Sequence, residues 1–311
     1  MVTAHLAKSV ESVAGNLNFD AQDVGLTSWR PSDELERLKG PTGISLPEKR
    51  RPKASIIVCT TRPEAYAALL ASLKQQTVQT FELFTIRQRG PLNSLRNGGL
   101  SFANAPITCI IDDDTICPPR WLEGILATFA KHPEVVGVSG PAIITDAWRK
   151  NRHLFRYPWL SRLYRWAFLD HPDIPGHISR SGAPTTCSAD ADCRYEGYVD
   201  FLEACNMSWR TQPLRAIGGF DETFGDLGEW GEPDCAARLR PAGRCYFTPA
   251  ASLFHQPARG GATLRRKRTQ SRLQNVELFH RRWVAPSWRA AAYRGFLRLY
   301  FGALELGLVK P

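Results

Sequence analysis

Three consecutive aspartates, at positions 112–114, follow the apolar run 107–111 directly and precede Pro118 and Pro119. The run is short, continuous and rich in β-branched residues, as expected of a strand that is buried on both faces. The carboxylates then lie at the carboxyl end of a strand, where open α/β sheets bind ligands. Adjacent carboxylates repel one another and lose solvation unless a cation neutralises them. Divalent ions that bridge phosphates are held by one or two carboxylates together with phosphate oxygens. The triplet therefore predicts a metal and phosphate site, with a solvated acidic turn as the alternative.

Strand-like and helix-like segments alternate on both sides of the aspartates from residue 54 onward. This alternation predicts an α/β domain with a mostly parallel central sheet and helices on both faces. The expected strands are 55–59, 81–86, 107–111, 135–138, 199–204 and 244–248, and the expected helices are one containing Leu69, Leu70 and Leu73, one at about 92–103 and one at 121–130.

The regular pattern divides the chain into three parts. Residues 1–53 are interpreted as an extension and linker with one short helix, and 54–257 as the single folded domain. Within that domain, 147–198 is rich in arginine and aromatic residues and is expected to form an inserted segment beside the site. Residues 258–311 form a basic tail with a helical pattern.

Composition sets the class of protein. A chain of 311 residues with 43% hydrophobic content can bury one large core or two small ones. Its eight cysteines show no paired short spacing and are interpreted as reduced thiols, most of them in the core. No N-terminal stretch resembles a signal peptide, and no run reaches the roughly 18 apolar residues of a spanning helix. A cytoplasmic protein is therefore expected.

The net charge of +10 belongs to the tail. Residues 257–311 carry twelve Lys/Arg and two Asp/Glu, while the rest of the chain carries 28 of each sign. The stretch 290–309 is apolar apart from Arg294, Arg298 and Glu305, so it can form an amphipathic helix. Such a helix lies on an anionic membrane surface or docks on its own domain, and both alternatives stay open. Without a recognisable module, nucleic acid is not expected as a partner.

Short motifs between residues 54 and 257 together resemble family 2 glycosyltransferases. The resemblance implies the GT-A fold, which binds nucleotide sugars, and a transferase activity. Each motif is weak alone, but they occur in the family's order. The motifs are 55–64, 69–77, 95–100, 112–114 with 119–122, 205–210, 217–222, 231–234, 238–243 and His255.

The resemblance implies roles for the acidic residues and the histidine. Transfer from a nucleoside diphosphate sugar expels a diphosphate, and a divalent metal stabilises that leaving group. Asp114, Asp112 and His255 would hold Mn²⁺ or Mg²⁺, and Asp112 or Asp113 would contact the ribose or metal-bound water. For His255 a purely structural role is the alternative.

An inverting transfer also needs a general base that takes the proton of the acceptor hydroxyl. The family carries this base in an acidic pair at a helix start, which corresponds here to Gly231 and Glu232. We expect Glu232 to be the base, with Asp234 and Glu229 in reserve. Pro233 departs from the family's pattern, and these acids also suit the positive end of a helix. A capping role is therefore the alternative.

The nucleotide pocket is expected to involve Thr60, Arg62, Glu64 and Arg96. Many family members end their second strand with an acid that reads the base, but residues 84–90 contain none. Gln88 has an amide that can both donate to and accept from a base edge, and contact of Arg87 or Arg89 with a phosphate is the alternative, so the base stays open.

The sequence thus predicts a metal-dependent, inverting glycosyltransferase that moves a sugar from a nucleotide-sugar donor to a glycan or lipid-linked acceptor, at the cytoplasmic membrane face if the tail binds lipid. One rival is a nucleotidyltransferase, although 60–63 lacks the glycine- and lysine-containing phosphate loop that this class would require. The other rival is a non-catalytic sugar- or lipid-binding protein on the same fold.

Overall fold

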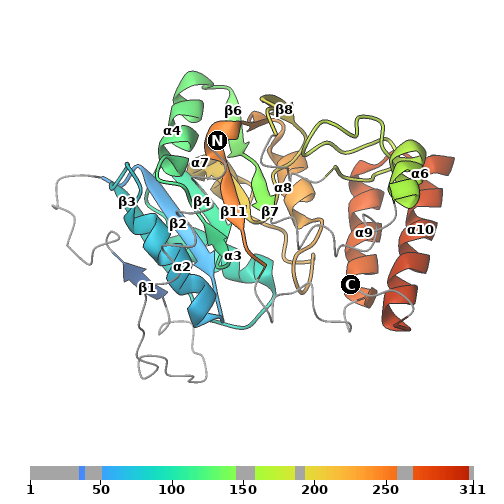
Figure 1. The fold of residues 1–311 in the computed structure, drawn as a ribbon, viewed down its shortest axis with the longest axis horizontal. Helices are drawn as coiled ribbons and strands as arrows, with labels where there is room; N and C mark the ends of the chain where they lie inside the picture. The colour runs from blue at the N-terminus through green and yellow to red at the C-terminus, as the bar shows by residue number, and fades with distance from the viewer. Residues whose placement is uncertain (1–34, 39–50, 145–157, 186–192, 258–268, 308–311) are drawn as a thin grey trace.

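A central sheet carries the site in the computed structural model, which describes residues 35–38, 51–144, 158–185, 193–257 and 269–307. Among these residues the sheet has eight strands in the order β1-β3-β2-β4-β9-β6-β10-β8. Figure 1 shows it flanked by helices. The strands are β1 (Leu35–Leu38), β2 (Ala54–Cys59), β3 (Phe81–Ile86), β4 (Ile107–Asp112), β6 (Val135–Ser139), β8 (Gly197–Val199), β9 (Asn206–Arg210) and β10 (Arg244–Phe247).

Most strands of this sheet point in one direction. β2 pairs in parallel with both β3 and β4, and β10 pairs in parallel with β6. β9 lies antiparallel between β4 and β6, so these two neighbours of β9 again share a direction. The carboxyl ends of β3, β2, β4, β6 and β10 therefore face the same edge of the sheet, as the predicted α/β class requires.

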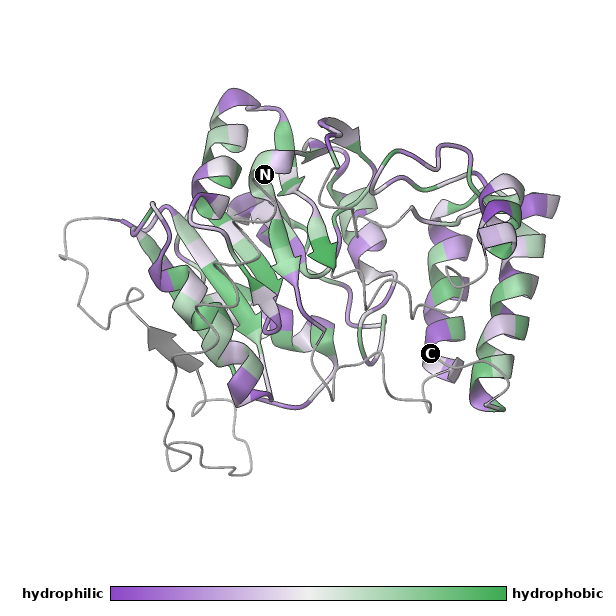
Figure 2. Ribbon diagram, in the orientation of Figure 1, coloured by the Kyte–Doolittle hydropathy of each residue, from purple (hydrophilic) through white to green (hydrophobic). Residues whose placement is uncertain are grey.

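Two helical layers cover the sheet because alternate residues of each strand point to opposite faces. Ile56 and Val58 of β2 pack with helices α2 (Pro63–Lys74) and α4 (Trp121–Lys131). Ile57 packs on the other face, against α3 (Leu92–Phe102), α7 (Thr211–Ala216) and α8 (Gly231–Leu239). Figure 2 shows hydrophobic residues concentrated on the strands and hydrophilic residues on the outer faces of the helices.

A glycine lets α3 approach the sheet closely. A Cβ atom at Gly99 would lie 2.5 Å from Cγ2 of Ile57, whereas a Cβ at the neighbouring Gly98 would meet nothing within 4 Å. The close packing fixes the distance between α3 and β2. It thereby sets the position of Arg96, which lies one turn earlier on the same helix.

A second, three-stranded sheet joins distant parts of the chain. It consists of β5 (Thr115–Ile116), β11 (Leu253–His255) and β7 (Ala142–Ile144). In its register His255 lies opposite Thr115, and the backbone N–H of Gln256 donates to the carbonyl of Asp114 at 2.8 Å. This pairing brings His255 to the end of β4.

Three helices form a separate cluster at one end of the molecule (Figure 1): α6 (Pro158–Phe168), α9 (Thr269–Trp283) and α10 (Trp288–Glu305). Tyr293 and Leu297 of α10 are buried, and Phe168 of α6 lies 5.4 Å from the ring of Tyr293. The tail helix thus docks on its own chain, one of the two alternatives that the sequence left open.

The arginines of the tail also have partners within the molecule. Of the six arginines in 269–307, five form ion pairs with acidic side chains of the chain itself. The pairs are Arg272–Glu229, Arg282 with Asp221 and Asp234, Arg289–Asp170, and Arg294 and Arg298 with Glu277.

Residues 35–38 form the edge strand β1, which pairs antiparallel with β3. The short helix expected in 1–53 stays a prediction, because 1–34 and 39–50 lie outside the described residues. The strand expected at 199–204 ends at residue 199, and the following strand is β9. The expected insertion is described only at 158–185 and from 193, and the basic run 265–268 lies outside the described residues.

Two expectations from composition agree with the structure. Every described cysteine is a free thiol, and burial raises the pKa of Cys59 and Cys109 to about 12. None of the described helices is both long enough and apolar enough to cross a membrane.

Candidate active site

The three aspartates lie where the parallel strands end. The register pairs Cys59 of β2 with both Asp112 of β4 and Ile86 of β3. The residues that follow these strands, Thr60 among them, therefore gather around the triplet. Thr60 Oγ1 donates to Asp113 Oδ2 at 2.6 Å, and both residues are buried.

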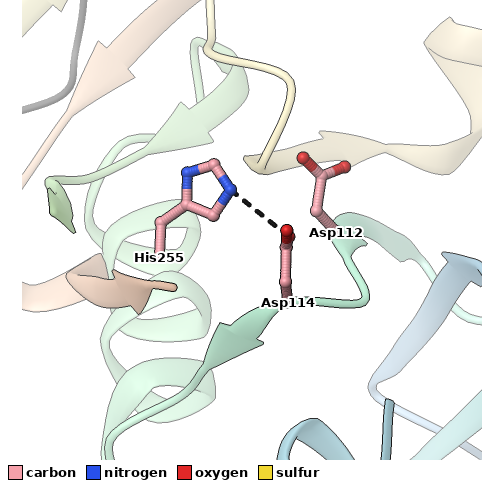
Figure 3. Close-up of side chains that lie close together, drawn as sticks. All are labelled: Asp112, Asp114 and His255. Atoms are coloured by element: carbon pink, nitrogen blue, oxygen red, sulfur yellow. Dashed lines mark ion pairs between the residues drawn. The ribbon is translucent and has the colours of Figure 1, made fainter. Parts of the chain in front are cut away.

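Asp112, Asp114 and His255 form a cluster suited to a metal ion (Figure 3). One potential ligand atom from each lies within 4.8 Å of the others, and His255 Nε2 is 3.3 Å from Asp114 Oδ1. Two carboxylates and an imidazole fit Mn²⁺ in particular, and the carboxylates alone fit Mg²⁺. The structure thus brings together the three residues that the sequence predicted as metal ligands.

The electrostatics of the cluster show how strongly its charges interact. Burial, followed by the charge of Asp114, raises the pKa of Asp112 to about 6. Burial on its own would lower the pKa of His255, but its hydrogen bond to Asp114 and the nearby carboxylates raise that pKa above its usual value. A divalent cation would relieve this repulsion between the carboxylates.

Arg62 supplies a positive charge from the start of α2. Its Nη1 lies 3.1 Å from Asp114 Oδ2, and its Nε donates to Asp113 Oδ2 at 3.1 Å. A second contact joins Nη2 to the other oxygen of Asp113. Asp113 therefore faces Thr60 and Arg62, whereas Asp112 and Asp114 face His255.

Two predicted nucleotide contacts lie apart from this network. Glu64 is exposed in the first turn of α2, and Gln88 is half-buried just after β3. Neither is hydrogen-bonded to the aspartates in the described part of the chain. Both stay predictions, and Gln88 has the better position because β3 neighbours β2 in the sheet.

Arg96 connects the nucleotide side of the site to the predicted base. It is only 1% exposed, and its Nη1 lies 2.8 Å from Glu232 Oε1 and 3.2 Å from Asn93 Oδ1. Its charge also acts on Asp112, whose pKa it lowers. Among the described residues its Nη2 has no hydrogen-bond partner, so this buried donor is left for a ligand.

Glu232 and Asp234 both lie in the first turn of α8, but their surroundings differ. Glu232 contacts Arg96, whereas Asp234 is fully buried. Asp234 accepts hydrogen bonds from Arg238 Nε (2.8 Å), Arg282 Nη1 (3.0 Å) and Trp283 Nε1 (2.8 Å). A catalytic role for Asp234 stays a prediction, and these contacts favour Glu232 as the base.

Sequence reasoning missed two of the residues that hold Asp234. Arg282 and Trp283 lie in the basic tail, for which the sequence left membrane binding and docking on the domain both open. No motif or spacing distinguishes Arg282 from the adjacent Arg281, so only the fold could reveal this contact.

Residues 56–179 match the family model of glycosyl transferase family 2. The resemblance to family 2 glycosyltransferases is confirmed. The matched segment runs from β2 to just beyond α6, so it includes Thr60, Arg62, Arg96 and the aspartate triplet. Glu232 and His255 lie beyond it. No protein in a curated collection matches the sequence.

Solved structures resemble the chain in fold. Residues 1–349 of S. aureus TarS in complex with UDP-GlcNAc align with a TM-score of 0.50 and 11% identity, over 82% of this chain and 73% of that chain. A mannosyltransferase from Pyrobaculum calidifontis in complex with GDP-Man and Mn²⁺ aligns with a TM-score of 0.49 and 16% identity, over 82% of this chain and 74% of that chain. The alignment with TarS confirms the GT-A fold class, and the family match supports a transferase.

The metal cluster yields a first prediction. Asp114 contacts His255 and is one of the three residues expected to hold the metal ion. Replacing it by alanine is therefore expected to abolish Mn²⁺-dependent binding of a nucleoside diphosphate. Isothermal titration with UDP and GDP, with and without Mn²⁺, measures this. Asp173→Ala, which removes an exposed carboxylate that pairs with Arg165 of α6, should bind as the wild type does. Nucleotide affinity that ignores Mn²⁺ in all three proteins would refute the metal site.

Proposed function

We propose that the protein is a metal-dependent, inverting glycosyltransferase that uses a nucleotide-sugar donor. The observation that carries this proposal is the cluster of Asp112, Asp114 and His255 at the carboxyl end of β4. A metal held there stabilises the departing diphosphate as a Lewis acid. Mn²⁺ or Mg²⁺ fits this role, and the imidazole favours Mn²⁺.

The chain's own residues provide the remaining requirements. Arg62, placed beside Asp113 and Asp114, can exchange a carboxylate for a phosphate oxygen when the donor enters. The unpartnered Nη2 of Arg96 offers a buried donor to the same ligand. Thr60 orients Asp113, and Gln88 is proposed to read the base from the end of β3.

Glu232 is proposed to accept the proton of the acceptor hydroxyl as that oxygen attacks the anomeric carbon. Its Oε1 lies 2.8 Å from Nη1 of the buried Arg96, and this contact holds the carboxylate in place at the start of α8. Because Arg96 also influences Asp112, the base and the metal cluster belong to one electrostatic unit. This arrangement supports transfer in a single displacement.

Each of the two rival functions leaves one observation unexplained. A nucleotidyltransferase does not account for the family 2 match over 56–179. A non-catalytic binding protein does not require a buried Arg96–Glu232 pair facing the metal cluster. Turnover of a panel of nucleotide sugars with Mn²⁺ or Mg²⁺ distinguishes all three, since only a glycosyltransferase releases the nucleoside diphosphate.

The second prediction concerns the base. Glu232→Gln keeps the shape of the side chain but cannot accept the proton, so transfer should fall by about 10²–10⁴-fold. Donor affinity should barely change because the loss falls on the transition state. Steady-state kinetics and donor titration measure both quantities. Glu123→Gln, at the first turn of α4, is the matched control and should retain full activity. Normal turnover by Glu232→Gln would assign the base elsewhere.

The acceptor is proposed to be a glycan or a lipid-linked sugar, with the protein at a cytoplasmic membrane face. Because Tyr293 and Leu297 of α10 are buried within the chain, this face of the helix is not available to bind a membrane. Helix α6 offers another surface. Its Trp159, Leu163 and Trp166 recur at helical spacing and are 65%, 49% and 80% exposed. Exposed Arg162 lies beside them, and α6 contains no acidic residue, while Arg165 pairs with Asp173 at 2.8 Å. Indoles and guanidiniums on one helix face suit the interface of an anionic membrane.

The third prediction tests this surface. The Trp159→Ala/Trp166→Ala variant should lose most of its co-sedimentation with anionic phosphatidylserine vesicles at low salt. Leu299→Ser, which removes an equally exposed side chain from α10, should bind as the wild type does. Equal losses of co-sedimentation in both variants would indicate that the membrane contact includes the tail helix α10. A wild-type protein that does not sediment with vesicles would exclude the membrane partner.

A further inference from the structure

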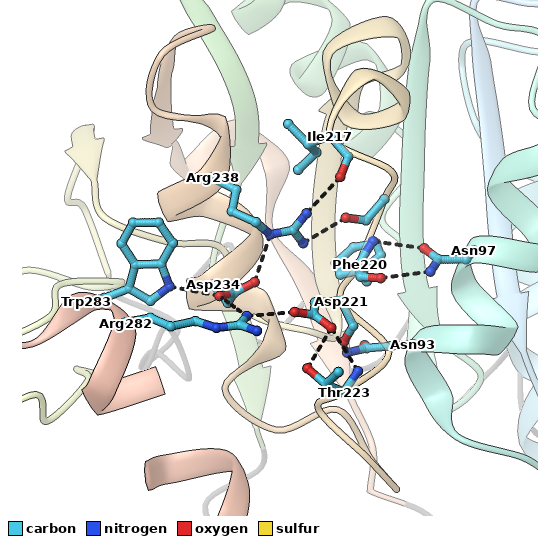
Figure 4. Close-up of polar contacts among 11 residues, drawn as sticks. Asn93, Asn97, Ile217, Phe220, Asp221, Thr223, Asp234, Arg238, Arg282 and Trp283 are labelled. Atoms are coloured by element: carbon cyan, nitrogen blue, oxygen red, sulfur yellow. Dashed lines mark hydrogen bonds and ion pairs between the residues drawn. The ribbon is translucent and has the colours of Figure 1, made fainter. Parts of the chain in front are cut away.

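Helix α9 contacts the loop and helix start that carry Glu232. The connection from α7 to α8 spans 217–230, and Glu232 follows in the first turn of α8. α9 packs beside α8, and its polar side chains reach this connection at several positions (Figure 4). Neither the metal cluster nor the nucleotide pocket accounts for these contacts.

The strongest contact is the buried carboxylate of Asp234. It lies two residues after Glu232 on the same helix turn and is completely shielded from water. A buried carboxylate is costly unless charged donors satisfy it. Arg238 supplies one donor from within α8, while Arg282 and Trp283 supply the other two from α9. The position of this turn of α8 therefore depends on the end of α9.

Arg282 extends the same contact to the connecting loop. Its Nη1 lies 3.0 Å from Asp234 Oδ1 and 2.6 Å from Asp221 Oδ2. Burial on its own would raise the pKa of the Asp221 carboxyl, but the hydrogen bonds that it accepts from Thr223 and its ion pair with Arg282 lower that pKa below its usual value. The Arg282 guanidinium thus links the connection, at Asp221, to the first turn of α8, at Asp234.

Two further residues just before Glu232 are held by the same helix. Trp230 has a left-handed backbone conformation with φ of 72°, which residues other than glycine rarely adopt. Its ring centroid lies 5.1 Å from that of Phe279, so packing on α9 maintains this conformation. Glu229 accepts from Arg272 Nε at 2.9 Å and 3.1 Å.

We propose that α9 is a positioning element of the active site, in which Arg282 and Trp283 orient the turn that carries the base. This inference rests on the proposed role of Glu232. Residues 229, 230 and 234 surround Glu232, and each is fixed by a side chain of α9. The helix acts through Asp234 and the loop, not by touching substrate. Arg282 and Trp283 of the tail thus serve the domain that carries the proposed base.

The test uses the full-length chain with three variants. Trp283→Phe keeps the aromatic ring but removes the N–H that reaches Asp234, and Arg282→Ala removes both ion pairs. Arg281→Ala is the matched control, because Arg281 is an exposed neighbour that makes no ion pair in the described structure. A displacement of the base of about 1 Å can cost about 10²-fold in rate. We therefore expect kcat to fall by about 10–10²-fold in Trp283→Phe and Arg282→Ala, with donor Kd unchanged and Arg281→Ala like the wild type.

Hydrogen exchange provides a readout that does not depend on turnover. Backbone amides of 225–234 should exchange faster in Trp283→Phe and Arg282→Ala than in the wild type or in Arg281→Ala. Unchanged kcat and unchanged exchange in both variants would overturn the proposal. So would a parallel loss of Tm, donor affinity and kcat, which indicates general stabilisation. If the wild type turns over no nucleotide sugar, the proposed function fails, and hydrogen exchange still decides whether α9 holds this turn.

Discussion

The confinement of three carboxylates at the end of one central strand is the constraint on which the structure of the site depends. β4 is flanked by β2 and β9, so Asp113 and Asp114 are almost completely removed from water. Such a group of charges is stable only if cations surround it. The chain supplies Arg62 from the connection after β2 and His255 from the second sheet. Asp112, Asp114 and His255 remain arranged for one further positive charge, which a divalent metal would provide.

The pairing of buried and half-buried charges continues beyond the aspartates. Arg96 is buried on α3 and pairs with Glu232, so the proposed base and the aspartates share one positive neighbour. Farther out, α9 and α10 carry most of the described charge of the tail, and acidic groups of the chain neutralise most of it. Five of the six arginines in these two helices are therefore held by acidic side chains of the chain itself. An exposed aromatic face remains on α6, where Trp159 and Trp166 project from the helix cluster.

Local patterns were sufficient to predict the central strands and to place the aspartates at a strand end, whereas His255 was proposed from the family resemblance. The runs at 55–59, 81–86 and 107–111 are continuous and β-branched, so buried strands were the expected outcome, and carboxylates at a strand end indicate a site. β9 was missed because Asn206, Ser208 and Arg210 interrupt its apolar residues, and the side chains of Asn206 and Arg210 donate to distant partners such as Gly140 and Val135. The hydrogen bonds from Arg282 and Trp283 to Asp234 join residues that are 48 and 49 positions apart in the sequence. Nothing local to Arg282 or Trp283 indicates them, because their partner is set by helix packing.

The central claim is that Asp112, Asp114 and His255 hold a divalent metal that carries the donor's diphosphate. A crystal structure of the protein with Mn²⁺ and a nucleoside diphosphate, with data collected at the manganese absorption edge, tests this most directly. The account predicts one anomalous peak within coordination distance of Asp114 and His255, in contact with the diphosphate, and Arg62 turned from Asp114 towards a phosphate oxygen. A bound nucleotide without manganese at these residues, or manganese bound elsewhere, would contradict the account.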